Sequence, residues 1–148
     1  MAEVQLKNIL LAEDSANDVE LTLAALEADG LAKHVFAVHD GEEALDYLCR
    51  RGAFADRPDG LPRAVLLDIK MPKVDGLELL RLIRGDERLK WLPVVMLTSS
   101  CEETDLRRSY ELGANAYVVK PVDFSELTQA MRCLGYFWGI TNQPPPAP

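Results

Sequence analysis

Five short apolar runs, each followed by a stretch with helical periodicity, constrain what this chain can fold into. The runs are ILLA (9–12), VFAV (35–38), AVLL (64–67), VVML (94–97) and YVV (117–119). Runs without polar residues predict strands that are buried on both faces, as in a parallel sheet with helices on both sides. The sequence therefore predicts an α/β fold of (βα)5 form, with a doubly wound, parallel, five-stranded sheet.

Capping residues mark where several of the helices between these runs begin. Ser15 precedes the first amphipathic stretch and has the side chain of a good N-cap. Asp40 with Glu43, and Asp123 with Glu126, have the form of capping boxes. These signals place helix starts directly after the first, second and fifth apolar runs.

The composition excludes several classes of protein. The 148 residues suit one domain, and 48% hydrophobic with 27% charged residues is typical of a soluble globular chain. With 24 acidic and 16 basic residues the net charge is −8, which argues against direct binding of nucleic acid. No apolar run approaches the ~20 residues of a membrane span, and the start, MAEVQLKN, lacks the apolar centre of an export signal. We therefore expect a cytoplasmic protein without a membrane or nucleic-acid partner.

The cysteines and histidines do not suggest a metal site. Cys49, Cys101 and Cys133 are far apart and contain no CxxC pair. Neither His34 nor His39 has another His or Cys at metal-ligand spacing. We interpret the cysteines as free thiols in a reducing cytoplasm.

Chemically reactive side chains stand where the predicted strands end. Glu13 and Asp14 follow the first run, Asp68 the third, Thr98 the fourth and Lys120 the fifth. Ligands of parallel sheets bind at the carboxyl ends of the strands, so we expect these residues to lie close together. Clustered carboxylates repel one another, and a hard, oxygen-liganded dication such as Mg²⁺ removes that conflict. A phosphoryl group would then find the metal, Lys120 and Thr98 as partners. Asp68 is central in the strand order and is the natural nucleophile.

Four segments of the sequence match a known family pattern. They are LLAEDS (10–15), LLDIKMPKVDGLEL (66–79), VVMLTSS (94–100) and AYVVKPVD (116–123). In these segments the chain resembles the receiver domains of two-component response regulators, over about residues 7–135. The resemblance implies a flavodoxin-like fold. It also implies that a sensor histidine kinase transfers a phosphoryl group to the domain, which then switches protein–protein interactions or relays the phosphate.

The resemblance implies roles for the acidic residues of the site. Asp68 would be the phosphoacceptor. A Mg²⁺ ion, for which Mn²⁺ or Ca²⁺ could substitute, would be bound by Asp14, Asp68 and the backbone carbonyl of Lys70. Glu13 would help to hold the ion through water.

The resemblance also implies the parts that sense the phosphoryl group. Thr98 would be the switch hydroxyl, Tyr117 the switch aromatic and Lys120 the residue that binds the phosphoryl oxygens. The peptide bond between Lys120 and Pro121 is expected to be cis in this family.

The resemblance indicates a phosphoacceptor protein rather than an enzyme. Such a protein catalyses only its own phosphotransfer and its own slow dephosphorylation. In receivers, the positions of Lys70 and Ser100 flank the path of the attacking water. Neither side chain is an obvious base, so we expect the acyl phosphate to decay over minutes or longer.

A finer resemblance is to the small receivers that serve the phytochromes of cyanobacteria and other bacteria. It depends on NDV (17–19), on the long loop 52–62 and on the aromatic residues after the last helix. A phytochrome-type histidine kinase is therefore the expected partner. We expect the receiver over 1–135 and an aromatic, then proline-rich extension over 136–148, with no attached DNA-binding domain.

Three other functions remain to be compared with this one. A metal-dependent phosphatase would carry a second Asp two residues after the nucleophile, where this chain has Lys70. A flavin carrier would need a phosphate-binding loop after the first strand, where Glu13 and Asp14 would repel the phosphate. A scaffold that works without phosphorylation would not need the complete acceptor set.

Three consecutive aromatic residues, Tyr136, Phe137 and Trp138, follow the last expected helix. Such residues are unfavourable in water and predict a packing partner. We expect a homodimer formed through the helix over 102–112, the fifth strand and the last helix, with this aromatic segment clasping the partner. Two alternatives are that the segment folds back onto its own domain, or that it is covered by a docking helix of the histidine kinase.

Overall fold

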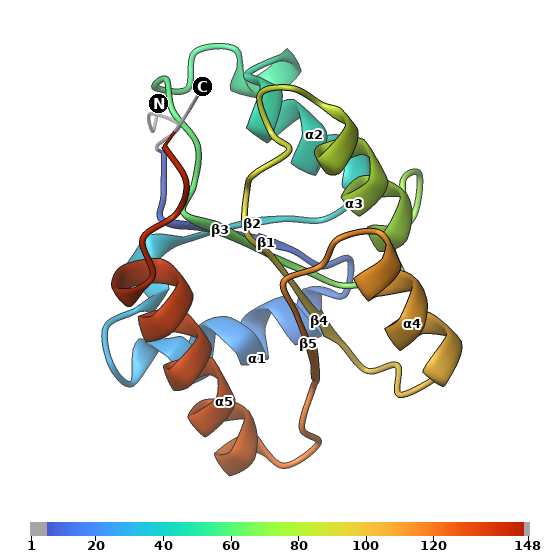
Figure 1. Ribbon diagram of the computed structural model, residues 1–148. Helices are drawn as coiled ribbons and strands as arrows, with labels where there is room; N and C mark the ends of the chain where they lie inside the picture. The colour runs from blue at the N-terminus through green and yellow to red at the C-terminus, as the bar shows by residue number, and fades with distance from the viewer. Residues whose placement is uncertain (1–5, 147–148) are drawn as a thin grey trace.

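All five predicted strands form, and they pair into one parallel sheet. The computed structural model describes residues 6–146 and places the strands in the order β2-β1-β3-β4-β5 (Figure 1). Their bounds are β1 (Ile9–Ala12), β2 (Val35–Val38), β3 (Ala64–Leu67), β4 (Val94–Thr98) and β5 (Ala116–Val119). The predicted (βα)5 flavodoxin-like fold is thereby confirmed. The strand order changes direction between β1 and β3, which is where such sheets bind ligands.

Five α-helices cover the two faces of the sheet. They are α1 (Ala16–Glu27), α2 (Gly41–Cys49), α3 (Gly76–Gly85), α4 (Glu103–Glu111) and α5 (Phe124–Tyr136). Helices α1 and α5 lie on one face, and α2, α3 and α4 lie on the other (Figure 1). Three shorter turns, η1 (Ala32–His34), η2 (Gly52–Phe54) and η3 (Phe137–Thr141), complete the described elements.

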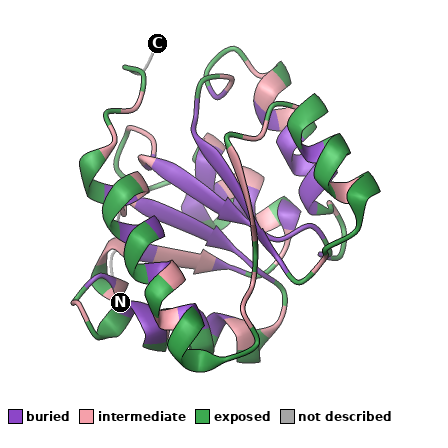
Figure 2. Cartoon of the chain, turned by 60° about the horizontal axis from the view of Figure 1, so that its bottom comes forward, coloured by how far each residue is buried: buried purple, intermediate pink, exposed green. Residues whose placement is uncertain are grey.

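Alternation along the strands divides the interior into two cores. Leu10, Val65 and Met96 pack toward α2 and α3, whereas their neighbours Ile9 and Leu66 pack toward α1 and α5. Successive strand side chains point to opposite faces, so a run without polar residues supplies both cores at once. Figure 2 shows the result, with buried central strands and helices that are exposed on their outer sides.

The predicted caps form as expected and fix where the helices start. The side chain of Ser15 accepts a hydrogen bond from the Asp18 N–H, at 3.2 Å. Asp40 and Asp123 accept from the N–H groups three residues further on, in α2 and α5. Because each cap satisfies an otherwise unpaired N–H, each helix begins close to the carboxyl end of the preceding strand.

The long loop 52–62 is more ordered than its Gly and Pro content predicts. It contains η2 and the side chain of Arg57, which is fully buried. The Arg57 guanidinium donates to the carbonyls of Tyr47, at 2.8 Å, and Pro58, at 2.7 Å, and lies 4.8 Å from the centre of the Tyr47 ring. Arg57 thus attaches the loop to the end of α2.

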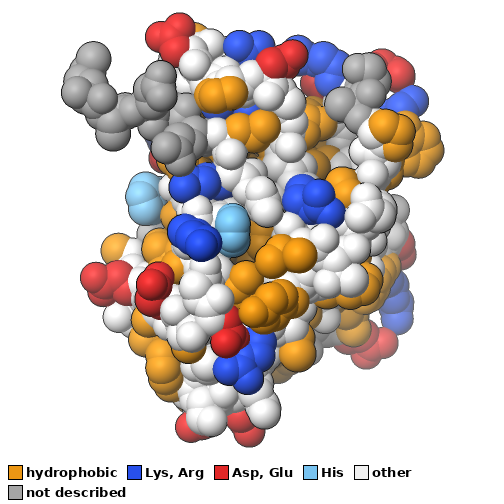
Figure 3. Space-filling model, turned by 90° about the vertical axis from the view of Figure 1, so that its left-hand side faces the viewer, with side chains coloured by type: hydrophobic (Ala, Val, Ile, Leu, Met, Phe, Trp, Pro, Cys, Tyr) orange, Lys and Arg blue, Asp and Glu red, His pale blue; other side chains and the backbone are white. Residues whose placement is uncertain are grey.

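The C-terminal segment folds back onto the domain at the amino ends of the strands. Trp138 packs against the core shared with α1 and α5. The Asn8 amide donates to the Gly139 carbonyl, at 3.1 Å, and Arg63 donates to the carbonyls of Ile140 and Asn142, at 3.1 and 2.6 Å. Figure 3 shows the side of the molecule that lies at the left of Figure 1, where hydrophobic side chains gather between basic ones.

Parts of two sequence arguments lie outside the described residues. Residues 1–5 belong to the segment used to argue against an export signal, and residues 147–148 end the proline-rich extension. Within residues 6–146, none of the helices has both the length and the apolar character that crossing a bilayer requires.

Candidate functional site

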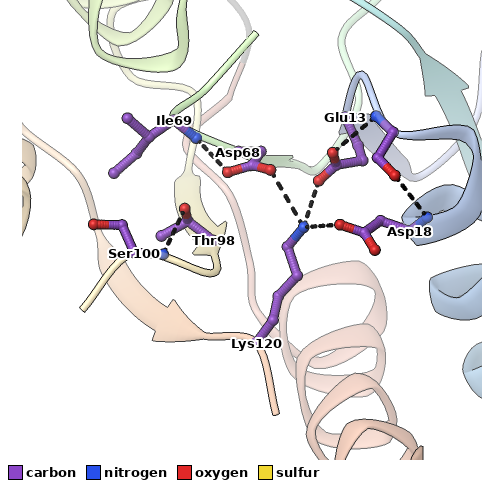
Figure 4. Close-up of polar contacts among 8 residues, drawn as sticks. Glu13, Asp18, Asp68, Ile69, Thr98, Ser100 and Lys120 are labelled. Carbon is purple, nitrogen blue, oxygen red and sulfur yellow. Dashed lines mark hydrogen bonds and ion pairs between the residues drawn. The ribbon is translucent and has the colours of Figure 1, made fainter. Parts of the chain in front are cut away.

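The predicted residues meet at the carboxyl edge of the sheet, where β1, β3, β4 and β5 end (Figure 4). Glu13, Asp14 and Asp68 each offer a carboxylate oxygen, and these oxygens lie within 4.8 Å of one another. Glu13 and Asp68 are buried, whereas Asp14 is exposed. Thr98, at the end of β4, is buried beside them. The clustering that strand order predicted is therefore present in the fold.

Lys120 is the cation at the centre of this cluster. Its ammonium nitrogen lies 2.5 Å from Oε2 of Glu13, 3.0 Å from Oδ2 of Asp18 and 3.2 Å from Oδ2 of Asp68 (Figure 4). A lysine ammonium has three N–H donors, and these three carboxylates occupy all of them. With Asp14 nearby, four carboxylates surround one ammonium, so negative charge remains in excess.

The two buried carboxyls ionise differently. Burial raises the pKa of Glu13 to about 8, the neighbouring Asp68 carboxyl adds to the rise, and Lys120 opposes it. Burial also acts to raise the pKa of Asp68, but hydrogen bonds from Glu13 and Thr98 outweigh burial and lower it. Burial disfavours the charge of Lys120, yet its bonds to these carboxylates raise its pKa above the usual value. The shifts are opposite in direction, so the site favours the ionised form of Asp68 more strongly than that of Glu13.

The backbone around Asp68 fixes the position of its carboxylate. Oδ1 accepts a hydrogen bond from the Ile69 N–H, at 2.7 Å. The Gly76 N–H donates to the Ile69 carbonyl, at 2.7 Å, and a Cβ at Gly76 would lie 2.1 Å from the Asp68 carbonyl oxygen. Gly76 therefore allows α3 to begin directly against the Asp68 backbone.

A second group of hydrogen bonds connects Thr98 to Tyr117. The Ser100 N–H donates to Oγ1 of Thr98, at 3.2 Å, and the Tyr117 hydroxyl donates to the Ser100 carbonyl, at 2.9 Å. The two predicted switch residues do not bond to each other. They are linked through the backbone of Ser100.

The carboxyl edge of the sheet is hollowed beside Asp68. Asp14, Lys70 and Thr98 line this hollow together with the residues just described. Both oxygens of Glu13 already accept bonds, from the Ser15 N–H at 3.0 Å and from Lys120. The donor set is made of hard oxygens with excess negative charge, which fits a divalent cation such as Mg²⁺.

A comparison with protein families decides which group this site belongs to. The model of the response regulator receiver domain matches residues 9–132. The chain belongs to the response regulator receiver family. Receivers accept a phosphoryl group as their family function, and the residues at the sheet edge of this chain match that chemistry.

Two curated relatives and one solved structure are similar to this chain over most of their length. The chain is 41% identical to the probable methanogenesis regulatory protein FilR2 of Methanothrix harundinacea (strain 6Ac), over 94% of this chain and 88% of that protein. It is 36% identical to the response regulator Rcp1 of Synechocystis sp., over 89% of this chain and 88% of that protein. A structure of Rcp1 in its Mn²⁺-bound form has a TM-score of 0.83 at 35% identity, over 95% of this chain and 99% of that chain.

A structure of the bacteriophytochrome response regulator AtBRR is also similar. It is 56% identical, with a TM-score of 0.74, over 93% of this chain and 99% of that chain. The finer resemblance to phytochrome-associated response regulators is thus confirmed at the level of homology.

One expectation about the receiver site is wrong. The bond between Lys120 and Pro121 is trans, and no cis peptide occurs within residues 6–146. The trans form is intrinsically favoured before proline. In this form the Lys120 N–H donates to the Thr98 carbonyl, at 2.8 Å, and the ammonium still reaches its three carboxylates.

Asp18 is a residue of the receiver site that the sequence argument did not identify. Asp18 lies in the first turn of α1. Acidic residues are favoured there by the helix dipole, so its presence does not by itself indicate a role in a site. Only the fold shows that Asp18 points at Lys120, which follows a strand about one hundred residues later. The sequence did contain a signal for this role. Because α1 begins directly after Glu13 and Asp14, the side chains of its first turn must lie near the site.

Proposed function

We propose that Asp68 accepts a phosphoryl group from a phosphohistidine of a sensor histidine kinase. The observation that carries this proposal is the position of Asp68, ionised and held between the Ile69 N–H and the Lys120 ammonium. An Asp68 oxygen attacks phosphorus, the bond from phosphorus to the histidine nitrogen breaks, and the nitrogen keeps the electron pair. The products are an acyl phosphate on Asp68 and a free histidine on the kinase.

Lys120 and Thr98 stabilise the charge that this transfer brings to the site. Phosphorylation converts the Asp68 carboxylate into an acyl group, so Lys120 exchanges one carboxylate partner for a phosphoryl oxygen. Thr98 is buried next to Asp68 and offers a hydroxyl donor. Prearranged donors of this kind lower the barrier for phosphoryl transfer, which depends mainly on positioning and electrostatics.

We propose that the divalent cation is Mg²⁺, with Mn²⁺ or Ca²⁺ as substitutes. Asp14, Asp68 and the backbone carbonyl of Lys70 would hold it, and Glu13 would act through water because both of its oxygens already accept bonds. The cation would neutralise the carboxylates and the phosphoryl oxygens. The excess of carboxylates over ammonium groups supports this assignment.

Phosphorylation is read out through Thr98 and Tyr117 in this proposal. The hydroxyl of Thr98 turns to the phosphoryl group, and the Tyr117 ring moves further inward. The proposal is supported by the bonds that join both residues to Ser100.

The protein acts as a switch rather than as a turnover enzyme in this proposal. Lys70 stands where an aspartyl phosphatase would carry its acid–base residue. Ser100 already donates its hydroxyl to Asp105, at 2.6 Å, and is not a base for water. We therefore expect the chain to catalyse only its own phosphotransfer and a slow loss of phosphate.

The partners follow from homology and from surface features. We propose a bacterial phytochrome-type histidine kinase as phosphodonor, since AtBRR, which is 56% identical to this chain, is a bacteriophytochrome response regulator. In this proposal residues 1–135 act as the receiver, and the extension 136–148 supports a homodimer through exposed Tyr136 and Phe137. The net charge of −8 and the free cysteines support a cytoplasmic role without nucleic acid.

Replacing Asp68 tests the proposed function directly. Asp68→Asn removes the nucleophile with little change in shape, so labelling by acetyl phosphate with Mg²⁺ should fall to background. Asp59→Asn, in the loop 52–62, is the control and should label like the unchanged protein, because its side chain is 93% exposed. Intact-mass spectrometry would measure the added phosphoryl group. Undiminished labelling of Asp68→Asn would contradict the assignment.

A further inference from the structure

Every polar group of Ser100 is engaged, and the bonds lead in different directions. Its N–H donates to Thr98 Oγ1, and its carbonyl accepts from the Tyr117 hydroxyl. Its hydroxyl donates to Oδ2 of Asp105, at 2.6 Å, and accepts from the Glu102 N–H, at 3.3 Å. Ser100 thus connects the phosphorylation site to the first turn of α4.

Helix α4 buries little of its own surface in the domain. Ser109 is its single buried residue, and Leu106 and Tyr110 are 39% and 52% exposed. By contrast, α3 buries five residues between Gly76 and Ile83. A helix with little apolar burial depends more strongly on its polar contacts, and its local opening free energy is low. The bond between Ser100 and Asp105 is a short contact to a charged acceptor, which is among the stronger kinds of hydrogen bond.

We propose that Asp105 is a positioning residue that latches α4 to the phosphorylation site through the Ser100 hydroxyl in the resting protein. This proposal rests on the proposed function, because it concerns how the phosphoryl group on Asp68 is reported outward. When Thr98 turns to the phosphoryl group, the Ser100 N–H loses its acceptor. The carbonyl that holds Tyr117 moves with the same backbone, and the bond from Ser100 to Asp105 is released.

The latch predicts a reciprocal effect between α4 and the site. If occupation of the site releases the latch, then the latch must weaken binding at the site by the same factor. Removing Asp105 should therefore loosen α4 in the resting protein and also tighten the binding of a phosphoryl mimic. A residue that only stabilised the fold would not increase affinity at the site.

The test compares three variants of the full chain. Asp105→Ala removes the acceptor of the Ser100 hydroxyl, and Asp105→Asn keeps an oxygen that can accept it. Glu103→Ala is the matched control, because Glu103 lies in the same first turn, carries the same charge and contacts Arg107 rather than the loop. Hydrogen exchange of the α4 amides and a titration with beryllofluoride in the presence of Mg²⁺ are the two measurements.

We expect Asp105→Ala to raise α4 exchange in the resting protein by about tenfold, as loss of one charge-assisted bond implies. Beryllofluoride should bind this variant several-fold more tightly and change its α4 exchange little, whereas it should accelerate exchange in the unchanged protein. Glu103→Ala should resemble the unchanged protein, and Asp105→Asn, which keeps a neutral acceptor, should fall between the unchanged protein and Asp105→Ala.

Two outcomes would overturn the latch. One is unchanged α4 exchange in Asp105→Ala, and the other is a beryllofluoride affinity in that variant that is equal or weaker. Either result would leave the role of Asp68 intact, since acetyl phosphate labelling of Asp68 is measured separately. Labelling of Asp68→Asn, in contrast, would overturn the proposed function whatever α4 does.

Discussion

At the scale of single residues, the site is organised by an imbalance of charge. Lys120 satisfies Glu13, Asp18 and Asp68 with its three donors, while Asp14 remains exposed at the mouth of the hollow. The protein therefore supplies one positive charge to a site that has four carboxylates. This arrangement keeps Asp68 ionised as a nucleophile and leaves Asp14 directed to a cation from solution.

The first residue-scale prediction concerns the cation. Asp14→Ala should weaken Mg²⁺ binding at least tenfold, or by about 1.4 kcal/mol, because it removes an exposed oxygen ligand without disturbing the buried pair. Glu20→Ala, on the exposed side of α1, removes the same charge and should leave affinity nearly unchanged. Calorimetric titration would measure both variants. Equal Mg²⁺ affinity in Asp14→Ala and the unchanged protein would refute this role.

The second residue-scale prediction concerns Gly76. A Cβ there would lie 2.1 Å from the Asp68 carbonyl oxygen, so the backbone of Asp68 or the start of α3 must move. We expect Gly76→Ala to lose about 1–3 kcal/mol of stability, as overpacked sites do, and to slow acetyl phosphate labelling.

Gly85 in the same helix provides the control. A Cβ at Gly85 would meet nothing within 4 Å, so Gly85→Ala should be neutral or stabilising by about 0.5–1 kcal/mol. Urea unfolding and labelling rates would be measured for both variants. Normal stability and labelling in Gly76→Ala would show that the close approach has no functional importance.

At the scale of elements, local patterns predicted strands and helices well because their causes are local. The apolar runs gave strand bounds that differ from the structure by at most one residue, and Ser15, Asp40 and Asp123 cap as predicted. Contacts between distant segments were not predictable in this way. Neither the bond from Asp18 to Lys120 nor the buried Arg57 leaves a periodic signal, since each depends on how separate elements pack.

The buried Arg57 leads to an element-scale prediction about the loop 52–62. Arg57→Met should destabilise the protein by about 2–4 kcal/mol, because it removes bonds from a charged donor to buried carbonyls and the contact with the Tyr47 ring. Arg88→Met is the control, because the Arg88 side chain is 68% exposed, and it should change stability by less than about 0.5 kcal/mol. The midpoint of urea unfolding would decide, and similar midpoints for the two variants would count against Arg57 as an anchor.

At the scale of the whole molecule, the two ends of the sheet have different tasks. The carboxyl edge holds the proposed phosphorylation site. At the amino edge, Asn8, Ile9 and Arg63 contact the C-terminal segment. Trp138 lies against the interior, so this part of the aromatic segment seals its own domain. Tyr136 and Phe137 remain 44% and 48% exposed and are the side chains available to a partner.

Trp138 packs against its own domain, whereas Tyr136 and Phe137 are exposed. We therefore predict that stability depends mainly on Trp138 and that dimerisation depends on Tyr136 and Phe137. Burying an aromatic side chain completely removes on the order of 150–250 Å² of its surface from water. Tyr136 and Phe137 are about half exposed, and a two-fold dimer would bury both of them on each subunit. The apolar area buried in this way would support association in the micromolar range. We expect the full chain to sediment as a dimer at tens of micromolar. The double variant Tyr136→Ser/Phe137→Ser should be monomeric and should lose less stability than Trp138→Ser, although the Phe137 ring packs edge-on against Trp138, with 4.9 Å between the ring centres.

Two controls separate this prediction from a general loss of apolar surface. Trp138→Ser should lower the free energy of unfolding by about 3 kcal/mol, as truncation of a packed aromatic does. Trp91→Ser removes an aromatic that is 64% exposed elsewhere on the surface and should leave the dimer intact. If the Tyr136→Ser/Phe137→Ser variant and the full chain have the same sedimentation coefficient, with and without a phosphoryl mimic, the aromatic segment serves only its own domain. In that case the exposed rings are not part of a subunit interface.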